Sequence, residues 1–346
     1  MLTEARLEQI LSRIPRLTLG VVGDLFLDRY LDIDASLTEP SLETGLDAYQ
    51  VVRVRPAPGA AGTVLNNLAA LGVGRIHVIS VIGDDGEGYE LRRALHELGC
   101  VDDRAMISLR DRRTPTYTKP MFQAASRPPR ELNRLDIKNR IPLLPAIEDA
   151  LLGSLDEAWN HVDGLLVVDQ VGEENCGVVT ARIRERLASL GKATPSKLIL
   201  ADSRRRIGLF QSVCLKPNVT ECVDAIRNIG GMGADVESCA AELARRARRP
   251  VFCTCGEKGM LVVDPRSASP AAVLVPAYAV AGPIDTVGAG DSTSAGIACA
   301  IAAGASPEEA AAFGNLVASI TIQQIGTTGT ATPEKVRRRR REVCHS

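Results

Sequence analysis

The chain has 346 residues, of which 45% are hydrophobic but only 3% aromatic, and its 41 basic residues almost balance its 42 acidic ones. This length suffices for one large α/β domain or two ordinary ones, and the balanced charge gives no general attraction to nucleic acid or to an anionic membrane. A core poor in aromatic rings must be built from Ala, Val, Leu and Ile, as in buried parallel strands covered by helices.

The first fourteen residues predict a charged amphipathic helix with Leu7, Ile10, Leu11 and Ile14 on its apolar face. They lack the uninterrupted apolar stretch of a signal peptide, and no later segment is long enough to span a bilayer. Nine irregularly spaced cysteines show no zinc pattern and indicate reduced thiols. We therefore expect a soluble cytoplasmic protein with neither a nucleic-acid nor a membrane partner.

Short apolar runs alternate with stretches of helical period along most of the chain. The runs that predict strands are Leu17–Val22, Ile76–Ile82, Gly164–Asp169, Lys197–Ala201, Val213–Lys216, Val251–Cys255 and Met260–Val263. Helical patterns fall at Gly62–Leu71, Glu87–Leu98, Gly177–Leu190 and Val236–Arg248. This alternation predicts a mainly parallel sheet with helices on both faces, and in such sheets ligands bind beyond the carboxyl ends of the strands.

Two stretches interrupt the alternation, from about residue 30 to 55 and from about residue 114 to 136. They contain short alternating pieces, Tyr49–Val54 and Thr116–Phe122, which could pair as a small sheet projecting from the main body. Two long surface loops are the alternative, but long loops without structure are uncommon in compact domains. We predict one domain, residues 1–346, with a β-sheet lid inserted in it.

A glycine-rich turn, Asp285-Thr286-Val287-Gly288-Ala289-Gly290-Asp291, is the most informative feature of the sequence. Gly288 and Gly290 permit a sharp turn that directs successive N–H groups into one concavity, and a helix starting there adds its positive dipole end. Asp291, beside a phosphate bound in that concavity, could accept the proton of an attacking hydroxyl. The alternative, an ordinary Asp helix cap, would explain only one residue of the motif.

This turn resembles the C-terminal signature of the PfkB, or ribokinase-like, carbohydrate kinases, and the resemblance runs from about Leu19 to Pro333. It implies a ribokinase-like three-layer α/β sandwich and ATP-dependent phosphorylation of a sugar hydroxyl, with Mg²⁺ as a cofactor. The residues that would act on the transferring phosphate are the base Asp291 and the N–H donors Gly288, Ala289 and Gly290. Asp285 would help to form a monovalent-cation site, which K⁺ could fill.

Two further motifs resemble the nucleotide side of the family. In Lys216-Pro217-Asn218-Val219-Thr220-Glu221, Glu221 would help to hold Mg²⁺ through water and Asn218 would lie near the nucleotide phosphates. One carboxylate together with substrate phosphates is the usual way in which Mg²⁺ is held. Taken alone, an Asn followed by Glu three residues later is an ordinary helix start.

The second of these motifs is Cys253-Thr254-Cys255-Gly256-Glu257-Lys258-Gly259-Met260, which resembles the Thr-x-Gly-x-x-Gly loop of the family. Thr254 and Gly256 would contact ATP, and Gly259 would let the next strand begin close by. A β-hairpin turn would explain the two glycines equally well.

On the acceptor side, Gly23-Asp24-Leu25-Phe26-Leu27-Asp28 follows the first predicted strand, as it does in the family. Asp28 corresponds to the carboxylate that binds the sugar hydroxyls in the family, and Asp24 is a second candidate for this contact. The glycines before Asp24 do not complete a dinucleotide fingerprint, which argues against an NAD-dependent dehydrogenase.

The N-terminal signature of the family is altered in this chain. Pro58-Gly59-Ala60-Ala61-Gly62-Thr63 has Gly59-Ala60 in place of the usual Gly-Gly pair and Thr63 in place of the usual sugar-binding Asn. Gly59 and Thr63 would face the sugar, but a hydroxyl cannot replace both the donor and the acceptor of an amide.

Several segments are similar to the heptose-phosphate kinase half of ADP-heptose synthases, among them Thr116-Tyr117-Thr118-Lys119 and Asn133-Arg134-Leu135-Asp136. Lys119, Arg130 and Arg134 could supply charge to a phosphorylated sugar. In contrast, Val168–Asn175 keeps Asp169, which would face the acceptor, but replaces the lysine of that branch with acidic residues that would repel a phosphate. The acceptor is therefore expected to be a sugar or a sugar phosphate.

A catalytically silent sugar or nucleotide sensor with the same fold is the alternative function, suggested by the changes at Ala60, Thr63 and Glu174. The retained Asp291 and Glu221 favour the kinase. Many relatives dimerise through the lid, so a homodimer is a further expectation. The run of five arginines from Arg337 to Arg341 is expected to be a solvated last helical turn rather than a nucleic-acid site.

Overall fold

The buried apolar runs form one large central sheet in the computed structural model, which describes residues 2–124, 128–231, 235–267 and 271–344. Its strands are β1 (Thr18–Gly23), β6 (Arg75–Gly83), β7 (Val101–Asp102), β8 (Met106–Leu109), β12 (Gly164–Asp169), β13 (Leu198–Ser203), β14 (Cys214–Leu215), β15 (Val251–Thr254), β16 (Met260–Val263) and β17 (Val273–Val275). Their order is β17-β16-β15-β14-β13-β12-β1-β6-β7, with β8 also pairing with β6. All pairs are parallel except those of β16 with β15 and β17.

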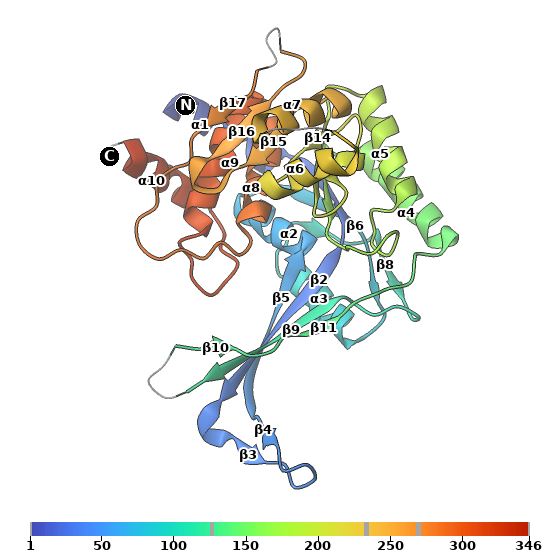
Figure 1. Ribbon diagram of the computed structural model, residues 1–346, viewed down its shortest axis with the longest axis vertical. Coiled ribbons are helices and arrows are strands. Elements are labelled where there is room, and N and C mark those ends of the chain that lie inside the picture. The colour runs from blue at the N-terminus through green and yellow to red at the C-terminus, as the bar shows by residue number, and fades with distance from the viewer. Residues whose placement is uncertain (1, 125–127, 232–234, 268–270, 345–346) are drawn as a thin grey trace.

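Helices cover both faces of this sheet and produce three layers (Figure 1). One face packs against α1 (Glu4–Arg13), α2 (Ala61–Ala70), α3 (Gly86–His96), α8 (Ala289–Ala302), α9 (Pro307–Thr321) and α10 (Pro333–Cys344). The other face packs against α4 (Pro145–Trp159), α5 (Ala181–Ala193), α6 (Val219–Asn228) and α7 (Val236–Ala247). Short 3₁₀ turns lie at Ile14–Arg16, Ala35–Leu37, Ile207–Leu209 and Gly256–Lys258.

The predicted α/β class and all the predicted strands are confirmed, with ends that differ by at most two residues. The helix expected to begin at Gly177 begins instead at Ala181, because the hydroxyl of Thr180 accepts the N–H of Ile183 and caps the helix there. None of the helices in the described part of the chain is both long and apolar enough to cross a membrane. The cysteines whose side chains are described are free thiols.

A second sheet projects from the main body at the lower end of Figure 1. It consists of β2 (Leu25–Asp34), β5 (Val51–Ala60), β9 (Thr116–Gln123), β10 (Arg130–Glu131) and β11 (Leu135–Ile137), and a small hairpin of β3 (Glu39–Pro40) and β4 (Asp47–Ala48) extends from it. The predicted pieces at 49–54 and 116–122 both join this projecting sheet, but each pairs with β2 rather than with the other. Residues 125–127 of the predicted lid lie outside the described residues.

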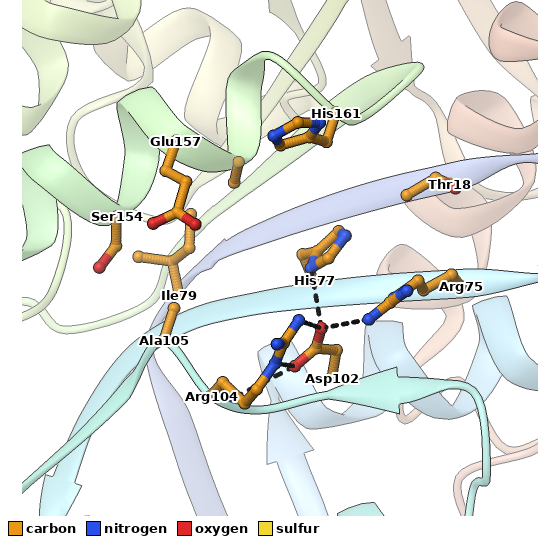
Figure 2. A pocket seen from close by; sticks show the side chains of 11 residues that line it. Thr18, Arg75, His77, Ile79, Asp102, Arg104, Ala105, Ser154, Glu157 and His161 are labelled. Atoms are coloured by element: carbon orange, nitrogen blue, oxygen red, sulfur yellow. Dashed lines mark hydrogen bonds and ion pairs between the residues drawn. The ribbon is translucent and has the colours of Figure 1, made fainter.

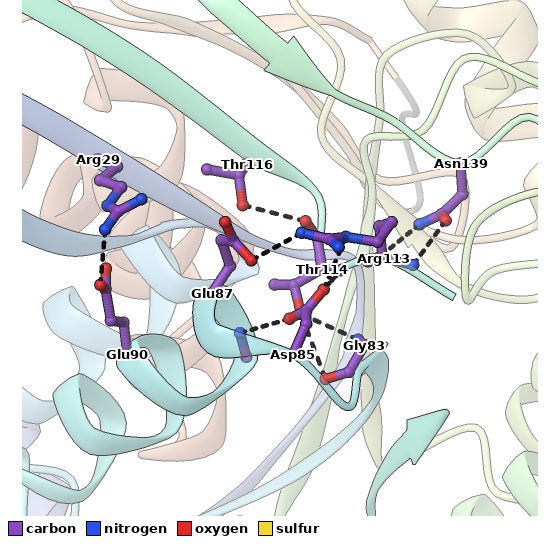
Figure 3. Close-up of polar contacts among 10 residues, drawn as sticks. Arg29, Gly83, Asp85, Glu87, Glu90, Arg113, Thr114, Thr116 and Asn139 are labelled. Atoms are coloured by element: carbon purple, nitrogen blue, oxygen red, sulfur yellow. Dashed lines mark hydrogen bonds and ion pairs between the residues drawn. The ribbon is translucent and has the colours of Figure 1, made fainter. Parts of the chain in front are cut away.

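A polar network fixes the point at which the projecting sheet leaves the central one (Figure 3). Asp85 caps α3 by accepting the N–H of Gly88 at 2.8 Å, and it also accepts the N–H and O–H of Thr114 at 2.9 and 2.7 Å. Burial alone would raise the pKa of Asp85, but these donors lower it, so the carboxylate is the stable form. Because β9 begins two residues after Thr114, the network sets the start of this strand.

Helices α8 and α9 approach closely because glycines face each other between them. A Cβ atom placed on Gly296 would lie 3.0 Å from the Cα of Gly314, and one on Gly314 would lie 3.1 Å from Ile297. Small and apolar residues fill α8, and every side chain from Ser292 to Ala300 is buried. This packing holds the start of α8 in place over the central sheet.

We predict that Gly314→Val lowers the free energy of unfolding by about 1–3 kcal/mol, because the added methyl groups overfill this interface. Gly153→Ala is the matched control in α4, since nothing lies within 4 Å of the new Cβ and a helical alanine is favoured over glycine by roughly 0.5–1 kcal/mol. Urea unfolding followed by circular dichroism measures both variants. A Gly314→Val variant as stable as the parent chain would show that the close approach is not required.

Candidate active site

Charged side chains gather at the carboxyl ends of the central parallel strands. Asp24 follows β1, Asp169 ends β12, Asp202 is the residue before the last one of β13, and Lys216 follows β14. Asp291 reaches the same region from the first turn of α8. This is the edge of a parallel sheet at which ligands bind.

The glycine turn forms as predicted and begins α8. Gly288 caps the helix with a φ of 77°, in the left-handed region that favours glycine. The N–H groups of Gly288 and Gly290 have no partner among the described residues. The expected third donor is already engaged, since the N–H of Ala289 donates to the carbonyl of Thr286 at 3.1 Å and closes the turn. Of the three expected donors, the N–H groups of Gly288 and Gly290 therefore remain free.

Asp291 is only partly exposed, and its carboxyl group is surrounded by charge. Burial is the main cause that raises its pKa to about 7, and the negative charge of Asp202 adds to it, whereas Lys216 and Arg204 lower it. A carboxylate that titrates near neutral pH suits a general base. The position and the pKa of Asp291 thus agree with the predicted chemistry.

A buried ion pair that the sequence did not single out lies next to this turn. The ammonium of Lys216 is 2.9 Å from Oδ2 of Asp202, and the hydroxyl of Ser294 donates to the same oxygen at 2.9 Å. Burial alone would lower the pKa of Lys216, but Asp202, Glu221 and Asp291 raise it and keep the group charged. Its ammonium would lie 3.7 Å from a Cβ on Gly290, so it faces the turn. The available signal was a lysine directly after a buried strand.

The two motifs expected to bind the nucleotide, around Asn218 and Thr254, lie side by side next to the Lys216–Asp202 pair. Asn218 and Glu221 cap α6 reciprocally, because each side chain accepts the backbone N–H of the other, at 2.9 and 2.8 Å. Asn218 forms a parallel bridge with Thr254, whose N–H donates to the carbonyl of Pro217 at 2.9 Å. Asn218 and Glu221 therefore form an ordinary helix cap and also lie next to the candidate site.

A cavity of about 410 Å³ opens between the 254–259 hairpin, the segment before α8, and helices α8 and α9. Its lining is Thr254, Gly256, Glu257, Gly259, Ala277, Tyr278, Ala279, Val280, Gly282, Ile284, Thr286, Ala289, Gly290, Thr293, Asn315, Ala318, Ser319 and Ile322. Gly259 has a φ of 106°, and a Cβ there would lie 2.2 Å from the carbonyl of Val275, so only glycine lets the hairpin approach β17. A cavity of this size and largely apolar lining fits a small ligand.

On the opposite side of the turn, the acceptor residues come together at the base of the projecting sheet. A carboxylate oxygen of Asp28 would lie 2.9 Å from a Cβ on Gly59, and the other is 3.1 Å from the ammonium of Lys119. Lys119 also donates to the hydroxyl of Tyr30 at 3.2 Å. Thr63 is buried in α2 and would contact a Cβ on Gly288 at 3.3 Å, so the two family-like signatures are adjacent.

Ala60 adopts φ 53° and ψ −118° at the start of α2, a backbone conformation that residues other than glycine rarely adopt. The substitution of the usual glycine therefore leaves strain at the acceptor side.

Two predicted sugar contacts, Asp24 and Asp169, are instead buried beneath the acceptor side. Asp24 is 4% exposed, and its two oxygens accept the N–H groups of Gln170, Val171 and Val178 at 2.7–3.0 Å. Asp169 is 2% exposed and accepts the hydroxyl of Ser203 at 2.6 Å. The oxygens of Asp24 face this loop and not an open site, so we correct its role to holding the 170–178 loop, whereas buried Asp169 contacts Ser203 and Arg206.

Burial and the charge of Asp24 raise the pKa of Asp169 to about 6. Arg206 partly offsets this effect from 3.4 Å, and its guanidinium also donates to the carbonyls of Val171 and Gly172 at 2.6 and 3.1 Å. Arg206 therefore fixes the same loop from the other side.

Arg204, two residues earlier, is exposed and has no hydrogen-bond or ion-pair partner for its side chain among the described residues. Burial raises the pKa values of Asp291, Glu221 and Tyr117, and the charge of Arg204 partly opposes that rise in all three. Tyr117 belongs to the projecting sheet, so the charge of Arg204 acts both there and at the glycine turn, and its side chain lines a cavity of about 430 Å³ together with Asn218 and Glu221. Arg204 was not among the expected site residues, although three consecutive arginines after a buried strand were a usable signal.

Asp285 anchors the segment before α8. Its oxygens accept the N–H groups of Val287 and Gly326, each at 3.0 Å, and its own N–H donates to Ile322 at 2.8 Å. Within the described residues, no group of three or more His, Cys, Asp or Glu side chains is arranged to hold a metal ion. A cation site at Asp285 therefore stays a prediction, and Glu221 fits Mg²⁺ only in the usual way, as one carboxylate acting with substrate phosphates.

A separate cavity of about 520 Å³ lies at the amino ends of β1 and β6, opposite this site (Figure 2). Arg75 and Arg104 both donate to Asp102, and His77 lies 3.3 Å from the same carboxylate. Glu157 balances the remaining positive charge in the lining. The cavity thus has no excess charge that would select a ligand.

Comparison with known proteins links the geometry to a family. Residues 208–335 match the family described as pfkB family carbohydrate kinase. The bifunctional protein HldE of Pelobacter propionicus is 31% identical over 339 residues, and that of a Bradyrhizobium species is 29% identical over 329 residues. These alignments cover 95% and 94% of this chain but 64% of each relative. The chain therefore spans about two thirds of the length of the curated relatives it matches.

Solved structures share the fold at low sequence identity. Ribokinase from Thermotoga maritima has a TM-score of 0.64 at 20% identity, covering 94% of this chain and 99% of that one. Arabidopsis thaliana ribokinase complexed with ribose and ATP has a TM-score of 0.66 at 17% identity, covering 93% and 98%. Phosphofructokinase-2 from Escherichia coli in complex with potassium has a TM-score of 0.67 at 17% identity, covering 95% and 99%. The ribokinase-like fold is therefore confirmed.

We predict that Asp24→Ala lowers the free energy of unfolding by about 3 kcal/mol or more, because it leaves three backbone N–H groups of the 170–178 loop without an acceptor. Asp84→Ala is the control, since that carboxylate is 60% exposed and makes only a 3.7 Å contact with Arg110. Urea unfolding of both variants measures the difference. Equal stability of Asp24→Ala and the parent chain would return Asp24 to the list of direct sugar contacts.

Proposed function

We propose that this chain is a member of the pfkB family of carbohydrate kinases and transfers the terminal phosphate of ATP to a hydroxyl of a sugar phosphate. The observation that supports this most is the placement of Asp291 at the start of α8. Its carboxyl group has a pKa of about 7 and lies among Asp202, Lys216 and the free N–H groups of the glycine turn. One group can accept a proton there while its neighbours stabilise negative charge.

The proposed reaction uses each part of the site once. Asp291 takes the proton of the acceptor hydroxyl, whose oxygen forms a bond to the terminal phosphorus of ATP as the bond to ADP breaks. The N–H groups of Gly288 and Gly290 and the ammonium of Lys216 stabilise the charge on the phosphoryl group. Mg²⁺, held with the help of Glu221, would neutralise charge on the nucleotide phosphates.

The 410 Å³ cavity next to Thr254 is the proposed site for the base and ribose of ATP, with Gly256 and Gly259 shaping its hairpin side. Asn218 would lie at the phosphate end of the nucleotide, beside Thr254. The potassium in the related phosphofructokinase-2 structure supports a K⁺ site near Asp285 as a prediction. A homodimer through the projecting sheet also stays a prediction, supported by the exposed Val52 and Val54.

A phosphorylated acceptor is favoured over a free sugar by the guanidinium of Arg204, whereas the acidic Glu173 and Glu174 of the 170–178 loop act against a phosphate. Asp28 is already paired with Lys119, so it adds little repulsion. Arg204 has no side-chain partner among the described residues, its charge acts on both Asp291 and Tyr117, and a planar guanidinium suits a phosphate. The HldE relatives are named bifunctional proteins, and they are longer than this chain. Their activities are therefore not assigned to this chain.

We predict that kcat/KM falls about tenfold for each pH unit below about 7, because protonated Asp291 cannot accept the hydroxyl proton. Asp291→Asn should lose about 10²–10⁴-fold in turnover and also lose this acidic limb, while binding ADP as before. Coupled ADP-release assays with a panel of sugars and sugar phosphates measure rates, and calorimetry measures ADP binding. An Asn variant with the turnover of the parent chain would refute the role of Asp291.

We further predict that Arg204→Gln raises KM for the best sugar phosphate about 10- to 100-fold, because a charge-assisted contact to its phosphate is lost. KM for ATP and the rate with the matching free sugar should change little. Arg182→Gln removes an equal charge from an exposed ion pair with Glu148 and Asp149 and serves as the control. An equal loss with the free sugar would place Arg204 at the transferring phosphate instead.

A further inference from the structure

One wall of the 410 Å³ cavity is an irregular segment between β17 and α8. Tyr278, Ala279 and Val280 of this segment line the cavity, and no helix or strand includes them. A backbone outside helices and sheets needs other partners to stay in one conformation. The contacts that hold this wall therefore decide how well the cavity is formed before a ligand enters.

Two side chains hold the wall. The buried amide of Asn315, in α9, donates to the carbonyls of Val275 and Pro276 at 3.0 and 3.1 Å. The guanidinium of Arg339, in α10, donates to the carbonyl of Ala279 and, at 3.2 Å, to the hydroxyl of Ser319. Ala279 and Ser319 both line the cavity, so Arg339 joins its loop wall to its helical wall.

Arg339 differs from its neighbours in the arginine run. Arg337 pairs with Glu8 of α1 at 2.9 Å, and Arg340 donates to the carbonyl of Leu2 at 2.8 Å. These contacts fasten α10 to the start of the chain, and the two ends lie close together in Figure 1. The side chain of Arg338 is 69% exposed, whereas that of Arg339 is 13% exposed and makes only a 3.4 Å contact with a carboxylate, Glu342. The arginine run therefore mainly forms intramolecular contacts that hold α10 against the first residues of the chain.

We propose that Arg339 is a positioning residue for the nucleotide, which acts by fixing Ala279 and Ser319 on two walls of the cavity. The inference rests on the proposed function, because it takes the cavity to be the ATP site. A guanidinium stays charged at any working pH and donates in several directions at once, so one side chain can join two acceptors. Without it, the wall would have to be ordered when the nucleotide binds, which weakens affinity without altering the transfer step.

The test measures ADP dissociation constants by calorimetry and the steady-state constants for ATP and the acceptor. Arg339→Gln should weaken ADP binding and raise KM for ATP about tenfold, whereas kcat at saturating ATP and KM for the acceptor stay unchanged. Arg339→Lys keeps the charge and one of the two bonds, and should weaken ADP binding about threefold.

Arg337→Gln is the matched control, because it loosens α10 from α1 but contacts no residue of the cavity. It should lower the melting temperature and leave ADP binding unchanged. The proposal is overturned if Arg339→Gln binds ADP as the parent chain does, or if Arg337→Gln weakens binding equally. If Arg339→Gln does not fold, Arg339→Lys decides in the same way. A parent chain that binds no ADP would refute the proposed function itself, a result distinguishable from a failure of the variants alone.

Discussion

The candidate site depends on one buried contact, the pair of Lys216 with Asp202. It joins the ends of β13 and β14 and, through Ser294, holds α8 against them. Removing either charge would leave the other buried without a partner, at a cost of about 3–5 kcal/mol. The same ammonium faces the glycine turn, so the contact that fixes three elements also supplies positive charge where a phosphate would bind. One ion pair therefore both holds β13, β14 and α8 together and supplies a positive charge for the proposed phosphate transfer.

Features that depend on neighbouring residues could be predicted from the sequence. The buried strands, the glycine turn and the non-helical stretches of the projecting sheet each have a local pattern, and each forms in the structure. Helix α9 was not predicted, because it is buried on almost every side and therefore lacks a helical hydrophobic period. The roles of Asp24 and Arg204 depend on which strand ends become neighbours. The acceptor Asp24 and the donor Val178 are 154 residues apart, and no local pattern encodes that contact.

The two halves of the site differ in how completely they are formed. On the nucleotide side, the reciprocal cap of Asn218 and Glu221, the 254–259 hairpin and the anchored wall produce a defined cavity. On the acceptor side, the strained Ala60 departs from the Gly-Gly signature, Asp28 is paired with Lys119, and Arg204 is left without a partner among the described residues. The first half supports a common phosphate donor, and the second supports a particular, negatively charged acceptor.

Phosphorus NMR of the chain mixed with ATP, Mg²⁺ and each member of a panel of sugar phosphates and free sugars tests the central claim most directly. We predict that the terminal phosphate signal of ATP declines while ADP and one new phosphate ester appear in equal amounts. That transfer should occur with at least one sugar phosphate and be slower with the matching free sugar. Bound ATP that yields no ester with any acceptor, or only inorganic phosphate, would contradict the account.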